Sequence, residues 1–279
     1  MSTKVASLDA LRAELVALGP LVVALSGGAD SAFLAKVAHD TLGAERVLVA
    51  TALSPSLAAA EEADCRLLAA EWGLRWLGVP TDEMDDPDYV RNDADRCARC
   101  KTALMAALAP LAAAERATVV LGVNVDDLGD HRPGQSAAAA RGARFPLVDA
   151  GFTKGDVRHW SRALGLRTWD KPAAACLSSR IPYGTPVTLG ALGSIGRAEA
   201  SLRALGFGQL RVRHHGTVAR LEVDQGALAA VVARREEVIA VVRAAGYLYV
   251  TLDLEGFRSG SLNRALDHPG APGRDEEAP

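Results

Sequence analysis

The chain lacks several features that mark special classes of protein. Its 279 residues contain no hydrophobic run of about 18 residues, so we expect no membrane span. Basic residues are not in excess either, because 31 Lys and Arg stand against 34 Asp and Glu. The resulting net charge of −3 argues against a general affinity for nucleic acid. Length and composition otherwise fit a globular protein of one large or two smaller domains.

Cysteine is also scarce, with four residues in the whole chain. The first twenty residues carry Asp9, Arg12 and Glu14 among apolar neighbours, a pattern typical of an amphipathic helix and not of a signal peptide. We therefore expect a cytoplasmic protein. Its few cysteines are then reduced, metal-bound or catalytic, and not paired in disulfides.

The most informative stretch is Ser26-Gly27-Gly28-Ala29-Asp30-Ser31, the 26–31 loop. It follows an apolar run, residues 21–25, and precedes a helical pattern. Glycine lets the backbone approach a phosphate, and the start of a helix offers unpaired N–H groups with a partial positive charge. Ser26 and Ser31 add hydroxyl groups, and Asp30 adds a carboxylate suited to Mg²⁺ on a polyphosphate. The sequence thus predicts an anion site here.

The 26–31 loop also lacks the lysine of a Walker A motif, since no Gly-Lys-Ser/Thr follows it. Its sequence, Ser-Gly-Gly-x-Asp-Ser, is similar to the pyrophosphatase loop (PP-loop) of ATP-dependent adenylating enzymes. Such enzymes cut ATP between the α- and β-phosphates and activate a substrate as its adenylate. The plain alternative is an ordinary glycine turn at the end of a strand.

The first half of the chain alternates between strand and helix patterns, which predicts a parallel sheet with helices on both faces. The expected strands are residues 21–25, 46–52, 74–79 and 118–123, and the expected helices are residues 31–42, 57–72 and 98–114. Ligands of such sheets lie beyond the carboxyl ends of the strands. Polar residues follow three of these ends, at 26–31, 51–54 and 124–130, so we expect one nucleotide pocket there.

The pattern changes in the second half of the chain. A helix capped by Thr153 and an irregular stretch are followed by helix, strand, strand, helix and strand, at residues 189–205, 210–212, 219–223, 225–245 and 247–254. This order suggests a small α+β domain. We predict a first domain at 1–184, a second at 185–266 and a disordered tail at 267–279, which is rich in Pro, Gly and charge.

Cys176 lies in the irregular segment between the predicted domains, where catalytic groups are common. Lys171 and Arg180 flank it in sequence and would favour its thiolate. The alternative is a small buried side chain without a role in catalysis.

Cys97 and Cys100 form a Cys-x-x-Cys pair, which supplies only two metal ligands. Three interpretations stay open. The pair is a redox dithiol, or it joins Cys176 in a three-cysteine iron–sulfur site with one open iron, or the thiols are unrelated. Cys65, in a helical pattern, is expected to have a packing role.

Two further clusters suit phosphates. The strand-end segment 124–134 contains Asp127 and Arg132, where carboxylates suit Mg²⁺ or a ribose and the arginine suits a phosphate; a solvated turn is the alternative. Arg211 and Arg213 alternate on a predicted strand and therefore share one face. Two guanidinium groups there suit a phosphate monoester or a carboxylate, unless they form exposed ion pairs.

These segments together carry a family resemblance. The 26–31 loop, the 124–134 segment, Ala-Cys-Leu-Ser-Ser-Arg-Ile-Pro-Tyr-Gly at 175–184, Arg-Val-Arg at 211–213 and the segment 249–260 occur in the order found in the LarE family. The chain resembles that family over about residues 5–266. The resemblance implies an α/β fold of the PP-loop ATP pyrophosphatase (Rossmann-like) type with a smaller C-terminal α+β domain. It also implies a homo-oligomer, for which we expect a hexamer.

The resemblance implies a function in the synthesis of the nickel-pincer nucleotide cofactor. Pyridinium-3,5-biscarboxylic acid mononucleotide would be adenylated by ATP with Mg²⁺ and converted to a thiocarboxylate. Cys176 matches a cysteine that gives up its sulfur, and Arg180 and Glu199 match a substrate-carboxylate ligand and an acid/base near the thiol. Arg211 and Arg213 match phosphate ligands. The expected ATP-binding residues are Ser26, Gly27, Gly28, Asp30, Ser31, Gly122, Asp127 and Arg132, of which Asp30 would also bind Mg²⁺.

The sequence departs from the single-cysteine pattern of that family through Cys97 and Cys100. Related sulfur-inserting enzymes hold a 4Fe-4S cluster with such a pair and a distant third cysteine, here Cys176. Both sulfur sources stay open. The alternatives to this function are a tRNA thiolase, another adenylating amidotransferase with the same loop, and a regulator that binds ATP without turnover. A tRNA enzyme should show basic stripes or an added module, and neither is clear here.

Overall fold

The computed structural model describes residues 5–129, 133–172 and 175–258. The chain divides into two compact units: unit 1 covers Met1–Glu83 and Cys97–Ala174, and unit 2 covers Met84–Arg96 and Ala175–Pro279. The sequence predicted the boundary after Gly184; the structural division falls ten residues earlier and assigns the segment Met84–Arg96 to the second unit. The predicted tail, residues 267–279, lies outside the described residues.

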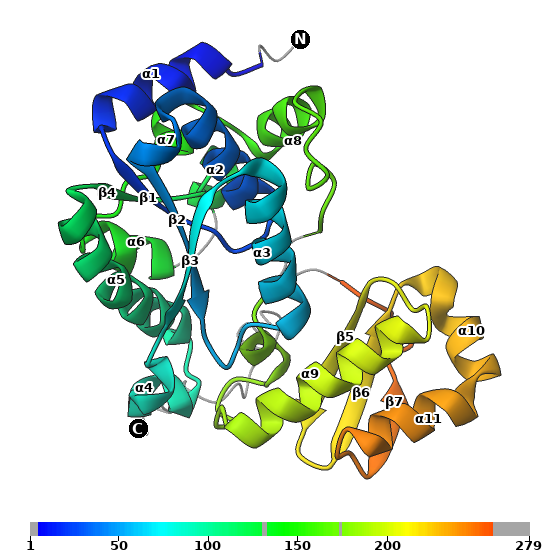
Figure 1. Cartoon of the computed structure of the whole chain (residues 1–279). Coiled ribbons are helices and arrows are strands. Elements are labelled where there is room, and N and C mark those ends of the chain that lie inside the picture. Colours follow the sequence, from blue (N-terminus) through cyan, green and yellow to red (C-terminus); the bar gives the residue numbers. More distant parts are fainter. Residues whose placement is uncertain (1–4, 130–132, 173–174, 259–279) are drawn as a thin grey trace, which may run out of the picture. The chain divides into compact units, whose positions relative to one another are not determined.

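Unit 1 contains a sheet of four parallel strands in the order β3-β2-β1-β4 (Figure 1). The strands are β1 Leu21–Ala24, β2 Val47–Leu53, β3 Arg75–Pro80 and β4 Thr118–Leu121. The central strand β1 pairs with both β2 and β4, so that Leu21 lies opposite Val47 on one side and Thr118 on the other. The predicted parallel α/β sheet is confirmed, with every strand within two residues of its expected bounds.

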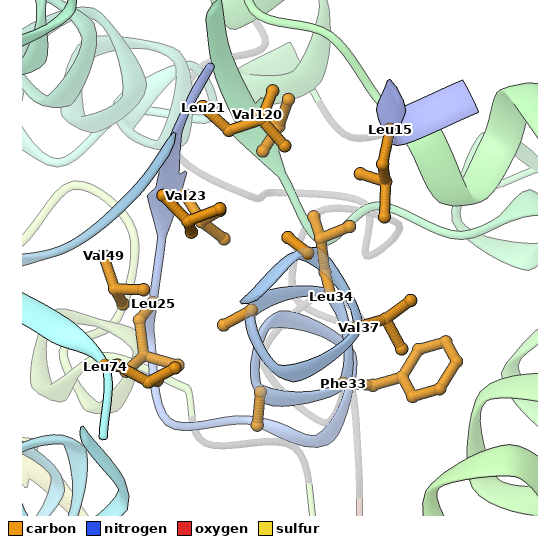
Figure 2. Close-up of a cluster of buried hydrophobic side chains, with 14 of the residues drawn as sticks. Leu15, Leu21, Val23, Leu25, Phe33, Leu34, Val37, Val49, Leu74 and Val120 are labelled. Carbon is orange, nitrogen blue, oxygen red and sulfur yellow. The ribbon is translucent and has the colours of Figure 1, made fainter. Parts of the chain in front are cut away.

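Helices cover both faces of this sheet. One face carries α1 Leu8–Leu18, α2 Ala29–Leu42, α3 Ala59–Trp72, α7 Pro146–Asp149 and α8 Lys154–Ala163, and the other carries α5 Arg96–Glu115 and α6 Pro133–Ala139. Because successive strand residues point to opposite faces, Val23 joins the first core and Val22 the second. Figure 2 shows side chains of β1, Val23 among them, in one cluster with Leu34 of α2. This packing fixes the start of α2 at the carboxyl end of β1.

Helix α5 is the one helix within the described residues whose length and composition would allow it to cross a membrane. Its side chains Leu104, Met105 and Leu108 are buried in the same core cluster as Val22 of β1. Helix α5 thus covers the second face of the sheet.

Unit 2 contains a three-stranded sheet in the order β5-β6-β7. Its elements are the short helix α4 Pro87–Arg91, then α9 Leu189–Ala204, β5 Leu210–His215, β6 Val218–Val223, α10 Leu228–Ala233, α11 Arg235–Ala244 and β7 Tyr249–Leu252. Strands β5 and β6 are antiparallel, and β6 and β7 are parallel. The predicted α+β order is confirmed.

The single long helix expected at 225–245 is wrong. A 3₁₀ turn, Gln225–Ala227, precedes α10, and the chain leaves helical geometry at Arg234, with φ −104° and ψ 26°. The Arg234 side chain donates to the carbonyl oxygen of Leu205 (2.7 Å) and to Glu237 in the first turn of α11. A tertiary contact therefore breaks a segment whose local pattern is helical throughout.

Candidate functional site

The 26–31 loop lies at the carboxyl end of β1 and leads into α2, whose N-cap is Gly28. Gly27 has a φ of +76°, the left-handed region that favours glycine. A Cβ at this position would lie 3.0 Å from Sγ of Cys65. Both the backbone conformation and the space behind the loop therefore require glycine.

The loop is held by its own hydroxyl groups. Oγ of Ser31 accepts a hydrogen bond from the backbone N–H of Ser26 (3.1 Å) and donates to the carbonyl oxygen of Gly28 (3.2 Å). Within the described part of the chain, the N–H groups of residues 28–31 have no protein partner. Such a row of N–H groups at the start of a 14-residue helix is suited to an anion. The anion site expected from the sequence stays a prediction.

Gly122 closes the loop from the side of β4. A Cβ at Gly122 would lie 2.7 Å from the backbone nitrogen of Ser31, so only glycine lets the end of β4 touch the first turn of α2. The structure therefore brings Gly122 to the 26–31 loop as a packing residue. Its expected role in ATP binding stays a prediction.

Asp30 has a partner that the sequence did not reveal. Its Oδ2 accepts a hydrogen bond from Nζ of Lys154, and its Oδ1 is buried without a partner among the described residues. Lys154 is the first residue of α8, and its backbone N–H donates to Asp126 (2.7 Å). An unpartnered carboxylate oxygen beside the N–H groups of the 26–31 loop has the chemistry that Mg²⁺ prefers, and the expected Mg²⁺ site at Asp30 stays a prediction.

The strand-end segment after β4 is ordered by its own carboxylates up to residue 129. Oδ2 of Asp127 accepts from the backbone N–H of Asn124 (3.2 Å). Arg132, the expected phosphate ligand, lies outside the described residues. Beyond it, Gly134 packs on the start of α5, where a Cβ would come within 2.9 Å of the carbonyl oxygen of Cys97. In unit 1 the Cys-x-x-Cys pair therefore adjoins the segment that follows β4.

Lys171 was expected to act on Cys176, and the structure gives it other partners. Its Nζ donates to Glu61 (2.8 Å) and Asp64 (2.6 Å), and it lies 3.5 Å from the position of a Cβ at Gly27. Burial favours a lower pKa for Lys171, but the hydrogen bonds to Asp64 and Glu61 outweigh it and raise the pKa above its ordinary value. A charged ammonium group therefore adjoins the 26–31 loop.

Cys176 is exposed and immediately precedes a short 3₁₀ helix, Leu177–Arg180. The buried guanidinium group of Arg180 holds the start of this segment, because its Nη1 donates to the carbonyl oxygens of Ala175 (2.7 Å) and Cys176 (2.9 Å). Arg180 thereby fixes the backbone that carries the thiol.

Glu199 is 1% exposed and accepts four hydrogen bonds. Two come from Arg180 (2.8 and 3.1 Å), one from the backbone N–H of Val212 (3.1 Å) and one from Arg203 (2.9 Å). Burial favours a higher pKa, but Arg180 and the other donors lower the pKa of Glu199 below 4.5. A carboxylate has about four acceptor positions, and all are used here. This environment favours a positioning role; the expected acid/base role stays a prediction.

Arg211 and Arg213 share one face of β5, as predicted, while Leu210 and Val212 point into the core. Arg213 donates to Glu222 (2.7 Å) and to the carbonyl oxygen of Ser179 (2.7 Å). Burial, followed by the charge of Arg180, lowers the pKa of Arg211 to about 10. The face thus concentrates positive charge beside residues 175–180, the segment that carries Cys176 and is called the Cys176 segment below.

Helix α4 and the residues after it hold the segment that follows Cys176 through hydrogen bonds that the sequence analysis did not predict. Asn92 has a φ of 66° and is fully buried, and its Nδ2 donates to the carbonyl oxygens of Pro182 and Thr185, both at 2.8 Å. Arg96 donates to the carbonyl oxygen of Ser178 (2.9 Å), and Tyr89 contacts the Ser178 hydroxyl group (2.7 Å). The spacing of Tyr89, Asn92 and Arg96 matches no recognisable sequence motif, so these contacts could not be predicted from the sequence.

The other cysteines differ in accessibility. Cys97 is exposed and Cys100 is partly exposed, both within the first two turns of α5. Cys65 is fully buried, and burial raises its pKa to about 11, which confirms the expected packing role. Within each unit, the described residues contain no group of three His, Cys, Asp or Glu that could hold a metal ion. Cys97 and Cys100 belong to unit 1 and Cys176 to unit 2; three thiols are suitable donors for an iron–sulfur cluster.

A parallel sheet with a Ser-Gly-Gly-x-Asp-Ser loop at the carboxyl end of its central strand defines an α/β protein of the PP-loop ATP pyrophosphatase type. No family model matches the chain. Three curated proteins are similar to it over most of its length. The chain is 36% identical over 267 residues to pyridinium-3,5-bisthiocarboxylic acid mononucleotide synthase of Lactiplantibacillus plantarum, covering 95% of this chain and 97% of that protein.

Two uncharacterized proteins are also similar. The protein slr1717 of Synechocystis is 45% identical over 262 residues, 93% of this chain and 97% of its own. The protein MJ0830 of Methanocaldococcus jannaschii is 25% identical over 240 residues, which cover 86% of this chain and 91% of that protein. Because the identity to the Lactiplantibacillus synthase extends over nearly both chains, the protein belongs to the LarE family of enzymes.

Proposed function

We propose that the protein is an ATP-dependent sulfur transferase that converts a carboxylate of pyridinium-3,5-biscarboxylic acid mononucleotide to a thiocarboxylate. Membership of the LarE family supports the proposal, because the Lactiplantibacillus relative is named for the bisthiocarboxylic acid mononucleotide. The observation that carries it in this chain is the 26–31 loop, with its row of N–H groups open to an anion.

In the first step, an oxygen of the substrate carboxylate attacks the α-phosphorus of ATP, and pyrophosphate leaves with the bonding electron pair. The products are an acyl-adenylate and pyrophosphate. The N–H groups of the 26–31 loop would stabilise the charge on the leaving phosphates. When bound at Asp30, Mg²⁺ would neutralise further phosphate charge.

The mononucleotide substrate carries a phosphate and carboxylates, and unit 2 offers complementary charge. Arg211 and Arg213 lie on one face of β5, and the pKa of Arg211 is lowered by burial and by the charges of its neighbours. A bound anion would relieve this repulsion. These arginines are therefore the proposed phosphate ligands. Arg180, which already donates to Glu199 and to the Cys176 segment, is proposed to act mainly by holding that segment.

In the second step, sulfur attacks the acyl carbon and AMP leaves. If Cys176 is the donor, its thiolate forms a thioester. A base then removes the Cα proton, the C–H electron pair forms the Cα=Cβ bond, and the Cβ–S bond breaks to release the thiocarboxylate and leave dehydroalanine. Alternatively, Cys97, Cys100 and Cys176 would hold a 4Fe-4S cluster, which when bound supplies a sulfide, and Cys176 would survive.

Pyrophosphate release tests the adenylation step. Purified protein with Mg²⁺ and ATP should release pyrophosphate only when the pyridinium dicarboxylate mononucleotide is added. ATP binding without pyrophosphate release, with the substrate present, would favour a regulator instead.

Anaerobic purification followed by iron, sulfide and intact-mass measurement tests the sulfur source. Loss of the mass of one H₂S from Cys176 after turnover would overturn the cluster. An oxygen-sensitive brown protein that is bleached by Cys97→Ala would overturn the sacrificial cysteine.

A further inference from the structure

We propose that Lys171 and Lys154 form a two-lysine clamp that binds the β- and γ-phosphates of ATP at the 26–31 loop. The inference rests on the proposed ATP-dependent function. It adds the cations that the loop lacks.

The 26–31 loop contains no basic residue. The N–H groups at the start of a helix carry a charge equivalent to about half a proton, whereas a triphosphate carries several negative charges. A Walker A loop meets this need with its own lysine. Here two ammonium groups from other parts of unit 1, those of Lys171 and Lys154, lie beside the loop.

Lys171 is suited to this role by position and by unused bonding capacity. Its Nζ lies 3.5 Å from the position of a Cβ at Gly27, directly beside the loop. An ammonium group has three N–H donors, and within the described residues two of these bond to Glu61 and Asp64. The third is available to a phosphate oxygen, while the two carboxylates fix the group in place.

Lys154 reaches the same loop from the start of α8. Its Nζ bonds to Asp30, a residue of the loop itself, and its backbone is held by Asp126. The Thr153 cap, which also bonds with Asp156, orders this end of the helix. One of the three donors of Lys154 is used on Asp30, so a phosphate can bind without breaking that ion pair.

The competing explanation is that Lys171 only neutralises Glu61 and Asp64. Asp64 has a second cation in Arg167 (2.6 Å), whereas Glu61 has Lys171 alone among the described residues. The double variant Glu61→Gln with Lys171→Met therefore removes one charge of each sign and leaves Asp64 paired. It keeps the proposal testable if Lys171→Met alone does not fold.

The test is calorimetric titration of the full chain with MgATP, inorganic pyrophosphate and AMP. Lys171→Met, Lys154→Met and the double variant should each lose about tenfold to hundredfold in affinity for MgATP and pyrophosphate, the range for one charge-assisted hydrogen bond. Their affinity for AMP should stay unchanged. Lys36→Met is the matched control, because Lys36 pairs with Asp40 further along α2, and it should bind as the unmodified chain does.

The titrations distinguish failure of the proposed function from failure of the two-lysine clamp. If the unmodified chain does not bind MgATP, the proposed function fails and the clamp fails with it. If the unmodified chain binds MgATP and the folded double variant and Lys154→Met bind it equally well, only the clamp is overturned. An equal loss of affinity for AMP and pyrophosphate would also overturn it, because that pattern indicates general disruption of the site.

Discussion

At the scale of single residues, Gly27 combines a left-handed backbone with a lack of space. We expect Gly27→Ala to cost about 1–3 kcal/mol of unfolding free energy through backbone strain and the contact with Cys65, and to abolish ATP binding. Gly43 is a matched control, since its φ is +82° but nothing lies within 4 Å of a Cβ there. Urea denaturation and ATP titration of both variants check the prediction; equal effects would contradict it.

The Arg180–Glu199 pair is also a residue-scale feature. Glu199→Gln should leave the Arg180 guanidinium group buried without a full countercharge and cost about 3–5 kcal/mol, the range for breaking one partner of a buried pair. The variant should also change the alkylation rate of the already exposed Cys176, with faster alkylation expected, because Arg180 holds the carbonyl oxygen of that residue. Peptide mapping after timed alkylation measures this. An unchanged rate would mean that Glu199 does not act through Arg180.

The lowered pKa of Glu199 sets the sign of a pH effect. A carboxyl group whose pKa is lower in the folded chain stabilises the fold above its unfolded value of about 4.5. This contribution decreases as the pH falls below that value toward the folded pKa. We therefore expect the urea midpoint of the unmodified chain to decline below pH 4.5 more steeply than that of Glu199→Gln. Parallel curves would contradict the assignment.

At the scale of elements, hydrogen bonds from α4 and the residues after it order the segment that carries Cys176. Asn92→Ala should cost about 2–4 kcal/mol, since it removes hydrogen bonds to two carbonyl oxygens and replaces an asparagine, which tolerates the left-handed region, by alanine at φ 66°. Asn92→Gly keeps the backbone conformation and removes only the side chain, so its smaller loss isolates the hydrogen bonds. Thermal unfolding of both variants separates the two causes, and identical losses would assign the whole effect to the side chain.

The elements of unit 1 could be predicted from sequence because local patterns determine them. The strands at 21–25 and 74–79 and the glycine-rich start of α2 appear where apolar runs and turn residues indicate them. The break at Arg234 could not be predicted, because a distant carbonyl oxygen, that of Leu205, causes it. The same holds for the site. The 26–31 loop is visible as a motif, whereas the partners of Lys171 lie on helix α3, more than 100 residues away in sequence.

At the scale of the whole molecule, the sulfur source determines how much product one chain can make. A bisthiocarboxylic acid needs two sulfur atoms. If Cys176 is consumed, two chains are needed for each product molecule, and added sulfide should not raise the yield. If sulfide is delivered by a cluster, yield per chain should rise with time under anaerobic conditions. Quantifying product against protein concentration decides between these outcomes, and Cys176→Ala should be inactive in either case.

The buried Cys65 behind Gly27 has a consequence for such experiments. With a fully buried thiol and a pKa of about 11, it should resist alkylation in the folded chain. Labelling under native conditions then counts only Cys97, Cys100 and Cys176, and labelling after denaturation counts all four cysteines. Cys65 thus serves as an internal standard within each molecule: its peptide reports protein amount and intactness while the other three report the fate of sulfur.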